Sequence, residues 1–365
     1  MKQKGSNAID RQTRADASLI EKVMPPQQSG SSTGGAGSPA AWSVEIGLTA
    51  AILAVRDSEP MVLVVRDAAL GFNGDALPFG PFSPLDHRTL DIGLRAGVAG
   101  QTGLELGYVE QLYTFGDRGR HAQPGDTGPH VVSIGYLALR QACEDLDDRN
   151  IWRSWYHYFP WEDRRQGPAQ ILDQDIIPRL NAWARAPVDP AAPERPIGRL
   201  ERVRMCFGID CTAASNTSTW DEEKVLERYE LLYEAGLAGE AHRDGRLTLD
   251  AGRMPIGAAM QFDHRRILAT AIGRIRGKIK YRPVIFELLP DEFTLYELQR
   301  TVEAILGPNL HKQNFRRLVE SAGLVEPTGV VKAATGGRPA KMYRFRRDVL
   351  LERPSPGVRV KPGRG

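Results

Sequence analysis

The residues best suited to chemistry are basic and amide side chains near the C-terminus. In HKQNFRRLVESAGLV at 311–325, helical periodicity turns Phe315 inward and leaves Asn314, Arg316 and Arg317 facing outward. Asparagine and arginine form paired hydrogen bonds with adenine and guanine, and lysine and arginine neutralise phosphates. The pattern predicts a contact with nucleic acid. The residues expected to make it are Thr294, Asn309, His311, Lys312, Gln313, Asn314, Arg316, Arg317, Lys332 and Arg338.

A helix-turn-helix is expected to position these side chains. Thr294 and Glu297 match a capping box in FTLYELQRTVEAILG, so a helix should begin there and end at Gly307-Pro308. The short turn GPNL leads into the second helix, and in this motif the early residues of that helix reach base edges. GLVEPTG and AKMYRFRR indicate two strands around the loop VVKAATGGRP, which together would form a basic wing.

Charge is distributed unevenly along the 365 residues, which hold 48 Lys and Arg and 45 Asp and Glu. From His264 to the C-terminus there are 21 basic and 9 acidic residues, whereas the remainder has 27 and 36. A polyanion is therefore attracted to one end of the chain. The balance favours DNA binding over the alternative, a small α/β module with a solvated basic face.

An α/β domain is expected at 43–187, after a leader at 1–42 that is too poor in apolar residues to become ordered. VEIGLTAAILAV and MVLVVRD predict a hairpin or two neighbouring strands, and YVEQLYTFGD and HVVSIGYLALR predict further strands. Helices are expected from Leu85 to Thr102 and in ILDQDIIPRLNAWAR, which Pro178 should break or kink. Strands and helices in this order favour a layered α/β fold.

The second half of the chain begins at the proline-rich PVDPAAPERP, and 188–262 is interpreted as a linker and helical extension. Its helix, WDEEKVLERYELLYEAGL, is expected to brace the fold or to form a dimer contact. A connecting helix in DHRRILATAIGRIRGKIK and a winged helix-turn-helix are expected at 263–351, with PVIFELL as a short strand, before a basic tail at 352–365. The apolar stripe of the connecting helix is Ile267, Ala271, Ile275 and Ile279.

Composition excludes several kinds of protein. No apolar run approaches the roughly 18 to 20 residues that cross a bilayer, and no signal-peptide core is present, so a cytoplasmic protein is expected. Three cysteines without CxxC spacing argue against a disulfide framework and a zinc knuckle, and the histidines show no metal-ligand spacing. The aromatic run IWRSWYHYFPWED at 151–163 favours a small apolar core or a dimer contact over stacking on adenine.

Four segments carry a family resemblance: VEQLYTFGDRGR at 109–120, FELLPDEFTLYELQRTVEAILG at 286–307, HKQNFRRLVESAGLVEPTG at 311–329 and GGRPAKMYRF at 336–345. In these segments the chain resembles the Nudix-related transcriptional regulators of NAD metabolism, the NrtR-like proteins. It resembles in particular a bacterial subgroup of NAD regulators. The resemblance implies an α+β multidomain protein. A Nudix-like α/β/α sandwich would be followed by a winged helix-turn-helix domain.

Active Nudix hydrolases carry a helix with the motif REUxEExGU, where U is aliphatic. Its glutamates hold divalent ions that neutralise a pyrophosphate and activate water. When LRAGVAGQTGL is aligned on Gly103-Leu104, Ala96 stands at the arginine position and Gly97 at the first glutamate position. The Glu-Glu pair is replaced by Gly100 and Gln101. Aligning on Gly80 instead matches Asp86 to an earlier glutamate of the box, and the later positions become Leu94, Arg95, Val98 and Ala99. Both registers leave the metal site empty, so an enzyme is not expected.

The resemblance therefore implies a domain retained for binding, with ADP-ribose as the first candidate effector and NAD as the second. Without a metal or other cofactor, arginines would pair with the diphosphate, and an acid would accept hydrogen bonds from ribose hydroxyls. The residues expected to bind the ligand are Arg66, Phe115, Gly116, Asp117, Arg118 and Arg120.

The function expected from this resemblance is repression of NAD biosynthesis or salvage genes by a homodimer on a palindromic operator. Two alternatives remain open. One is an active Nudix pyrophosphohydrolase with a basic accessory domain, and the other is an architectural DNA-binding protein without a ligand. The sequence leaves open the operator and the sign of the ligand's effect on DNA affinity.

Overall fold

The computed structural model describes residues 43–66, 74–117, 120, 130–142, 149–187, 195–208, 220–245, 254–332, 339–352 and 357–358. The predicted leader lies outside the described residues, and so does most of the predicted tail. Val358 is buried, and its N–H donates to the carbonyl oxygen of Ile279 at 2.9 Å. This residue therefore packs on the protein, whereas a fully solvated tail was expected. Within the described ranges, no helix has the length and apolarity to cross a membrane.

A mixed β-sheet forms the centre of the N-terminal domain. Its strands are β1 (Val44–Arg56), β2 (Glu59–Val65), β3 (Phe79–Pro81), β4 (Tyr108–Phe115), β5 (His130–Leu139) and β6 (Asn150–Ser154). They lie in the order β4–β5–β1–β2–β6, and β3 pairs with β1. β1 is parallel to β5 and antiparallel to β2, so the predicted hairpin is confirmed. It turns at Asp57 and Ser58, which both have positive φ.

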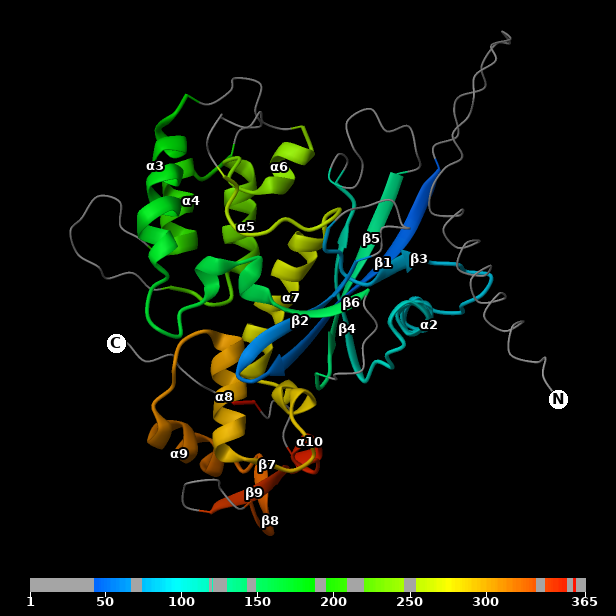
Figure 1. Ribbon diagram of the computed structural model, residues 1–365, viewed down its shortest axis with the longest axis vertical. Coiled ribbons are helices and arrows are strands. Elements are labelled where there is room, and N and C mark those ends of the chain that lie inside the picture. Colours follow the sequence, from blue (N-terminus) through cyan, green and yellow to red (C-terminus); the bar gives the residue numbers. More distant parts are fainter. Residues whose placement is uncertain are drawn as a thin grey trace, which may run out of the picture.

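Helices cover both faces of this sheet, because the side chains of β1 alternate between two apolar clusters. Leu48 and Ile52 pack with α2 (Leu90–Thr102) on one face, and Ala51 and Leu53 pack with α7 (His264–Ile279) on the other. Figure 1 shows the sheet between these helices. The predicted α/β/α sandwich is therefore confirmed. The predicted helix start at Leu85 was five residues early, because Thr89 caps α2 by accepting a hydrogen bond from the N–H of Ile92 at 3.2 Å.

The helical extension packs beside α7 and contributes to the same apolar cluster. Its elements are α4 (Arg199–Phe207), α5 (Val225–Glu234) and α6 (Gly239–Arg243), and the π-helical turn η4 (Leu172–Ile176) and α3 (Ile177–Arg185), from the end of the predicted domain at 43–187, pack beside them. Pro178 lies in the first turn of α3, just after the π-helical turn, so the predicted break is real. The apolar stripe predicted for α7 is fully buried. In Figure 1, α3 to α6 stand together on the α7 side of the sheet.

The aromatic run after β6 forms part of the core, as predicted. It contains the short helices η2 (Trp155–His157) and η3 (Pro160–Glu162). Trp155, Tyr158, Phe159 and Trp161 are each fully buried, so their rings have no free face for an adenine.

The C-terminal domain combines two helices with a three-stranded sheet. Its elements are η5 (Val284–Leu288), β7 (Phe293–Thr294), α8 (Leu295–Leu306), α9 (Lys312–Ala322), β8 (Val325–Lys332), β9 (Ala340–Phe345) and α10 (Val349–Glu352). The strand order is β7–β9–β8. The predicted helix-turn-helix and wing are confirmed, but the strand predicted in PVIFELL is wrong. Val284, Ile285 and Leu288 all point into the core, a spacing that a short helix satisfies and a strand does not.

Candidate nucleic-acid and nucleotide sites

The first helix of the helix-turn-helix begins at the predicted capping box. The hydroxyl oxygen of Thr294 accepts from the N–H of Glu297 at 3.1 Å, and the Glu297 carboxylate accepts from the N–H of Thr294 at 2.7 Å. Both amides would otherwise lack partners at the start of the helix. Thr294 is buried, and its hydroxyl is used in the cap. We therefore assign it to the cap and no longer to the DNA contact expected from the sequence.

The turn between the two helices is fixed by two polar residues of α8. Gln299 donates from Nε2 to the carbonyl oxygen of Leu310 at 2.9 Å, and the N–H of Leu310 donates to Glu303 Oε1 at 2.9 Å. Gln299 and Glu303 are buried, so their bonds to Leu310 form in a region of low dielectric. The turn places α9 in one orientation relative to α8.

The second helix, α9, buries one side and exposes the other. Phe315 and Val319 are buried, and Gly323 ends the helix with φ of +59°. No hydrogen bond or ion pair joins the exposed side chains to any described residue. These exposed side chains are His311, Lys312, Gln313, Asn314, Arg316 and Arg317.

The remaining predicted DNA contacts lie near α9 or on the wing. Asn309 is exposed and donates from Nδ2 to the carbonyl oxygen of Arg165 at 2.6 Å. Lys332, at the end of β8, donates to Glu297 at 2.8 Å, and Arg338 lies outside the described residues. Lys341, in the basic run AKMYRFRR, is exposed on β9 and was not among the predicted contacts.

The helix aligned with the Nudix box holds one carboxylate, Asp91, which forms an ion pair with Arg95 at 2.9 Å. Gly97 and Gly100 are exposed, and Gln101 accepts a hydrogen bond from the N–H of Phe79 at 3.0 Å. A cavity of about 20 Å³ beside α2 is lined by glycine, proline and apolar residues. Across the described ranges, no group of three His, Cys, Asp or Glu side chains is arranged to hold a metal ion.

The ligand residues predicted around β4 form a dense network of ion pairs. Arg120 donates from both Nη atoms to Glu230, at 2.9 and 2.7 Å, and its side chain is only 10% exposed. Asp117 pairs with Arg266, whose guanidinium lies 5.3 Å from the centre of the Phe115 ring. Gly116 accepts from His130 through its carbonyl oxygen, and Arg118 lies outside the described residues.

Asp263 completes this network from the residue before α7. Arg266 donates to its carboxylate at 3.1 Å, and Arg120 lies 3.7 Å away. Burial raises the pKa of Asp263 to about 7 even though both arginines favour the charged form. Together with Asp117 and Glu230 it gives the network three carboxylates for two arginines.

Arg66 belongs to a separate cluster, around Asp75. The buried carboxylate of Asp75 accepts from Arg66 Nε and from the hydroxyl of Tyr158, and it lies 3.1 Å from Arg153 Nε. Burial alone would raise the pKa of Asp75. The hydrogen bonds from Arg66 and Tyr158 and the charge of Arg153 outweigh burial, so the pKa lies below its usual value.

Residues 285–345 match the family model described as the NrtR DNA-binding winged helix domain. This match spans the C-terminal domain from η5 to the end of β9. The ADPR responsive transcriptional repressor NtrR of Acinetobacter baylyi is 45% identical over 86 residues, which cover 24% of this chain and 34% of that protein. The chain thus matches about a third of the length of this relative.

Two solved structures are similar over most of the chain. One is Shewanella oneidensis NrtR complexed with a 27mer DNA, which is 19% identical, with a TM-score of 0.48 over 84% of this chain and 95% of that one. The other is a MutT/nudix family protein from Enterococcus faecalis, which is 14% identical, with a TM-score of 0.44 over 95% of this chain and 100% of that one.

A buried ion cluster joins the winged helix to the rest of the chain. Glu162 accepts from Arg228 at 2.6 and 3.0 Å and from Arg276 at 2.5 Å, and all three side chains are fully buried. Burial alone would raise the pKa of Glu162. The charges and hydrogen bonds of Arg228 and Arg276 outweigh burial, so the pKa lies below its usual value and the carboxyl group is charged. Arg276 also donates from Nε to the carbonyl oxygen of Ile305 at 2.8 Å, at the end of α8.

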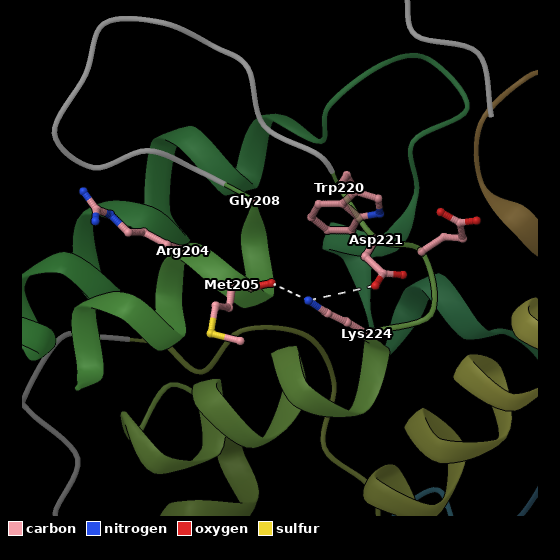
Figure 2. Close-up of a pocket in the computed structure, with 7 residues that line it drawn as sticks. Arg204, Met205, Gly208, Trp220, Asp221 and Lys224 are labelled. Atoms are coloured by element: carbon pink, nitrogen blue, oxygen red, sulfur yellow. Dashed lines mark hydrogen bonds and ion pairs between the residues drawn. The ribbon is translucent and has the colours of Figure 1, made fainter. Parts of the chain in front are cut away.

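The helical extension contains a larger hollow, of about 420 Å³, between the end of α4 and the residues before α5 (Figure 2). Lys224 reaches across it to the carbonyl oxygen of Met205 at 3.0 Å. The Trp220 ring on its wall contacts the guanidinium groups of Arg164 and Arg228, at 4.3 and 3.9 Å. No residue predicted to bind a ligand lies in this hollow.

Proposed function

We propose that this protein is a transcriptional repressor that binds operator DNA through its NrtR winged helix. The observation that carries the proposal is the exposed side of α9, where amide and basic side chains follow the turn fixed by Gln299 and Glu303. The family match over 285–345 and the name of the Acinetobacter baylyi relative support it. Such a repressor acts in the cytoplasm, where the chromosome lies, and we expect a homodimer on a palindromic operator.

We propose further that the Nudix-like domain binds an NAD-related nucleotide, ADP-ribose or NAD, without hydrolysing it. The relative is named as responsive to ADPR. Helix α2 supports a purely binding role, because in the register set by Gly103-Leu104 the positions aligned with metal-binding glutamates hold glycine, glycine and glutamine. The regulated genes would be those of NAD biosynthesis or salvage, and no metal or cofactor would be required.

Two assays on the purified full chain test these proposals. In the first, promoter fragments of NAD biosynthesis and salvage genes from the same genome should shift in a gel at nanomolar protein, and unrelated fragments should not. In the second, ADP-ribose incubated with the protein and magnesium or manganese should stay intact. Metal-dependent release of AMP would instead favour a pyrophosphohydrolase, and equal binding to all fragments would favour an architectural protein.

A further inference from the structure

Two arginines on neighbouring strands converge on one buried carboxylate. β2 and β6 are antiparallel partners, with Val65 opposite Asn150. Arg66 follows β2 directly, and Arg153 lies on β6. Both approach Asp75 through Nε, and the Tyr158 hydroxyl donates to the same carboxylate. Asp75 therefore holds both guanidinium groups in place.

This arrangement leaves the outer ends of the guanidinium groups available. Among the described residues, no hydrogen bond or ion pair engages the Nη atoms of Arg66 or Arg153. The two side chains are 46% and 25% exposed, so these donors are accessible to a ligand. Planar guanidinium donors form paired hydrogen bonds with phosphate oxygens, and two of them can neutralise a diphosphate.

The charge of this cluster suits an anion. Arg66 and Arg153 outnumber the single carboxylate, and the nearby His157 is exposed. Burial lowers the pKa of His157 most, and the charges of Arg153 and Arg66 also lower it, against the opposing charge of Asp75. The network around Arg120 has the opposite balance, with three carboxylates for two arginines, and both Nη atoms of Arg120 already bind Glu230. Even with Asp263 about half protonated near pH 7, the described part of this network carries no net positive charge to attract a diphosphate.

We propose that Arg66 and Arg153 bind the diphosphate of the nucleotide effector, with Asp75 as the residue that positions them. This assignment rests on the proposed function of the domain as a nucleotide sensor. It narrows the six residues predicted from the sequence to Arg66, and it adds Arg153, which no sequence pattern singled out.

The same cluster adjoins the helix that leads to the winged helix. The carbonyl oxygen of Asp75 accepts from the N–H of Gln261 at 2.9 Å, and that of Tyr158 accepts from Arg265 in the first turn of α7. At its other end, α7 binds α8 through Arg276, which donates from Nε to the carbonyl oxygen of Ile305. A ligand that moves the two guanidinium groups thus acts directly on the start of α7, through which it can bias the DNA-competent state.

Calorimetric titration of the full chain with ADP-ribose, NAD and inorganic pyrophosphate tests this site. Arg66→Gln and Arg153→Gln should each weaken binding of both nucleotides at least about tenfold, because a charge-assisted hydrogen bond is lost. Pyrophosphate should bind the wild type and not the double variant. The matched control is Arg140→Gln, since Arg140 follows β5 as Arg66 follows β2 and, among the residues that the structure describes, donates only to carbonyl oxygens. It should bind as the wild type does.

Removal of an arginine leaves the buried charge of Asp75 with only one guanidinium partner, which could destabilise the fold. Each variant is therefore also made in an Asp75→Asn background, and the folding of every variant is checked by thermal melting. Folded variants that bind ADP-ribose as tightly as the wild type would overturn the assignment and leave the sensor function intact. If the wild type binds pyrophosphate through these arginines but neither nucleotide, the anion site stands and the proposed nucleotide sensor is wrong. If the wild type binds none of the three, both are wrong.

Discussion

The DNA-binding face can be tested by removing Arg316 and Arg317 together. Both side chains are exposed on α9, and within the described ranges neither has a hydrogen bond or ion pair. The change to alanine therefore removes two charges from the surface without opening a cavity in the core. We expect the free energy of unfolding to change by no more than about 1 kcal/mol, the usual range for two such surface substitutions.

DNA affinity should respond much more strongly, and in a way that depends on salt. Each phosphate contact contributes about 0.9 to the slope of log K against log salt, so two lost contacts reduce the slope by about 1.8. Between about 50 and about 200 mM salt, the wild type should lose about twelvefold more affinity than the double variant. Fluorescence anisotropy with a labelled promoter duplex measures both slopes.

The matched control removes two exposed arginines from outside the C-terminal domain, Arg88 and Arg185. Its net charge equals that of the α9 variant, so it separates a contact with DNA from a general loss of positive charge. We expect its slope to equal that of the wild type. An α9 variant that stays folded and keeps the wild-type slope would refute the assignment of α9 to DNA.

Three further predictions concern stability, each measured by urea unfolding. Glu162→Gln should cost about 3 to 5 kcal/mol, because Arg228 and Arg276 would stay buried without a counter-ion, whereas apolar replacement of all three should cost much less. Thr294→Ala should cost about 1 kcal/mol by removing the cap of α8; a loss below the error of the fit would contradict the capping box. For Asp263, a pKa raised from 3.8 to about 7 means that the contribution of this group to the free energy of unfolding is fully present below about pH 4 and is lost as pH rises through 7. The free energy of unfolding of Asp263→Asn minus that of the wild type should therefore increase between about pH 4 and 7 and stay constant above about pH 8. A difference that is the same at every pH would show that the pKa of Asp263 is not raised.

The C-terminal domain was predictable from the sequence because its signals are local. The capping box spans four residues, and the spacing of Phe315 and Val319 sets the buried side of α9. PVIFELL failed because a short apolar run fits a strand or a helical turn equally well. Only its packing under the winged helix decides between them.

The candidate ligand site was less predictable because its partners are distant in sequence. Asp117 meets Arg266 across 149 positions, and Arg120 meets Glu230 across 110. These pairs use the carboxylate of Asp117 and the guanidinium group of Arg120, which were both expected to bind the ligand. Arg153 was missed because it and Arg66 meet at Asp75 only when β6 pairs with β2 in the folded sheet.

The central claim is that one chain couples recognition of an NAD-related nucleotide to DNA binding, and the most direct measurement is a nucleotide titration of the protein–promoter complex. ADP-ribose, NAD and NMN are each added to the complex while anisotropy reports DNA affinity. We predict that ADP-ribose or NAD changes the Kd for DNA at least about tenfold, a typical allosteric coupling. A Kd that stays constant with all three nucleotides, at concentrations that saturate any binding seen by calorimetry, would contradict the account.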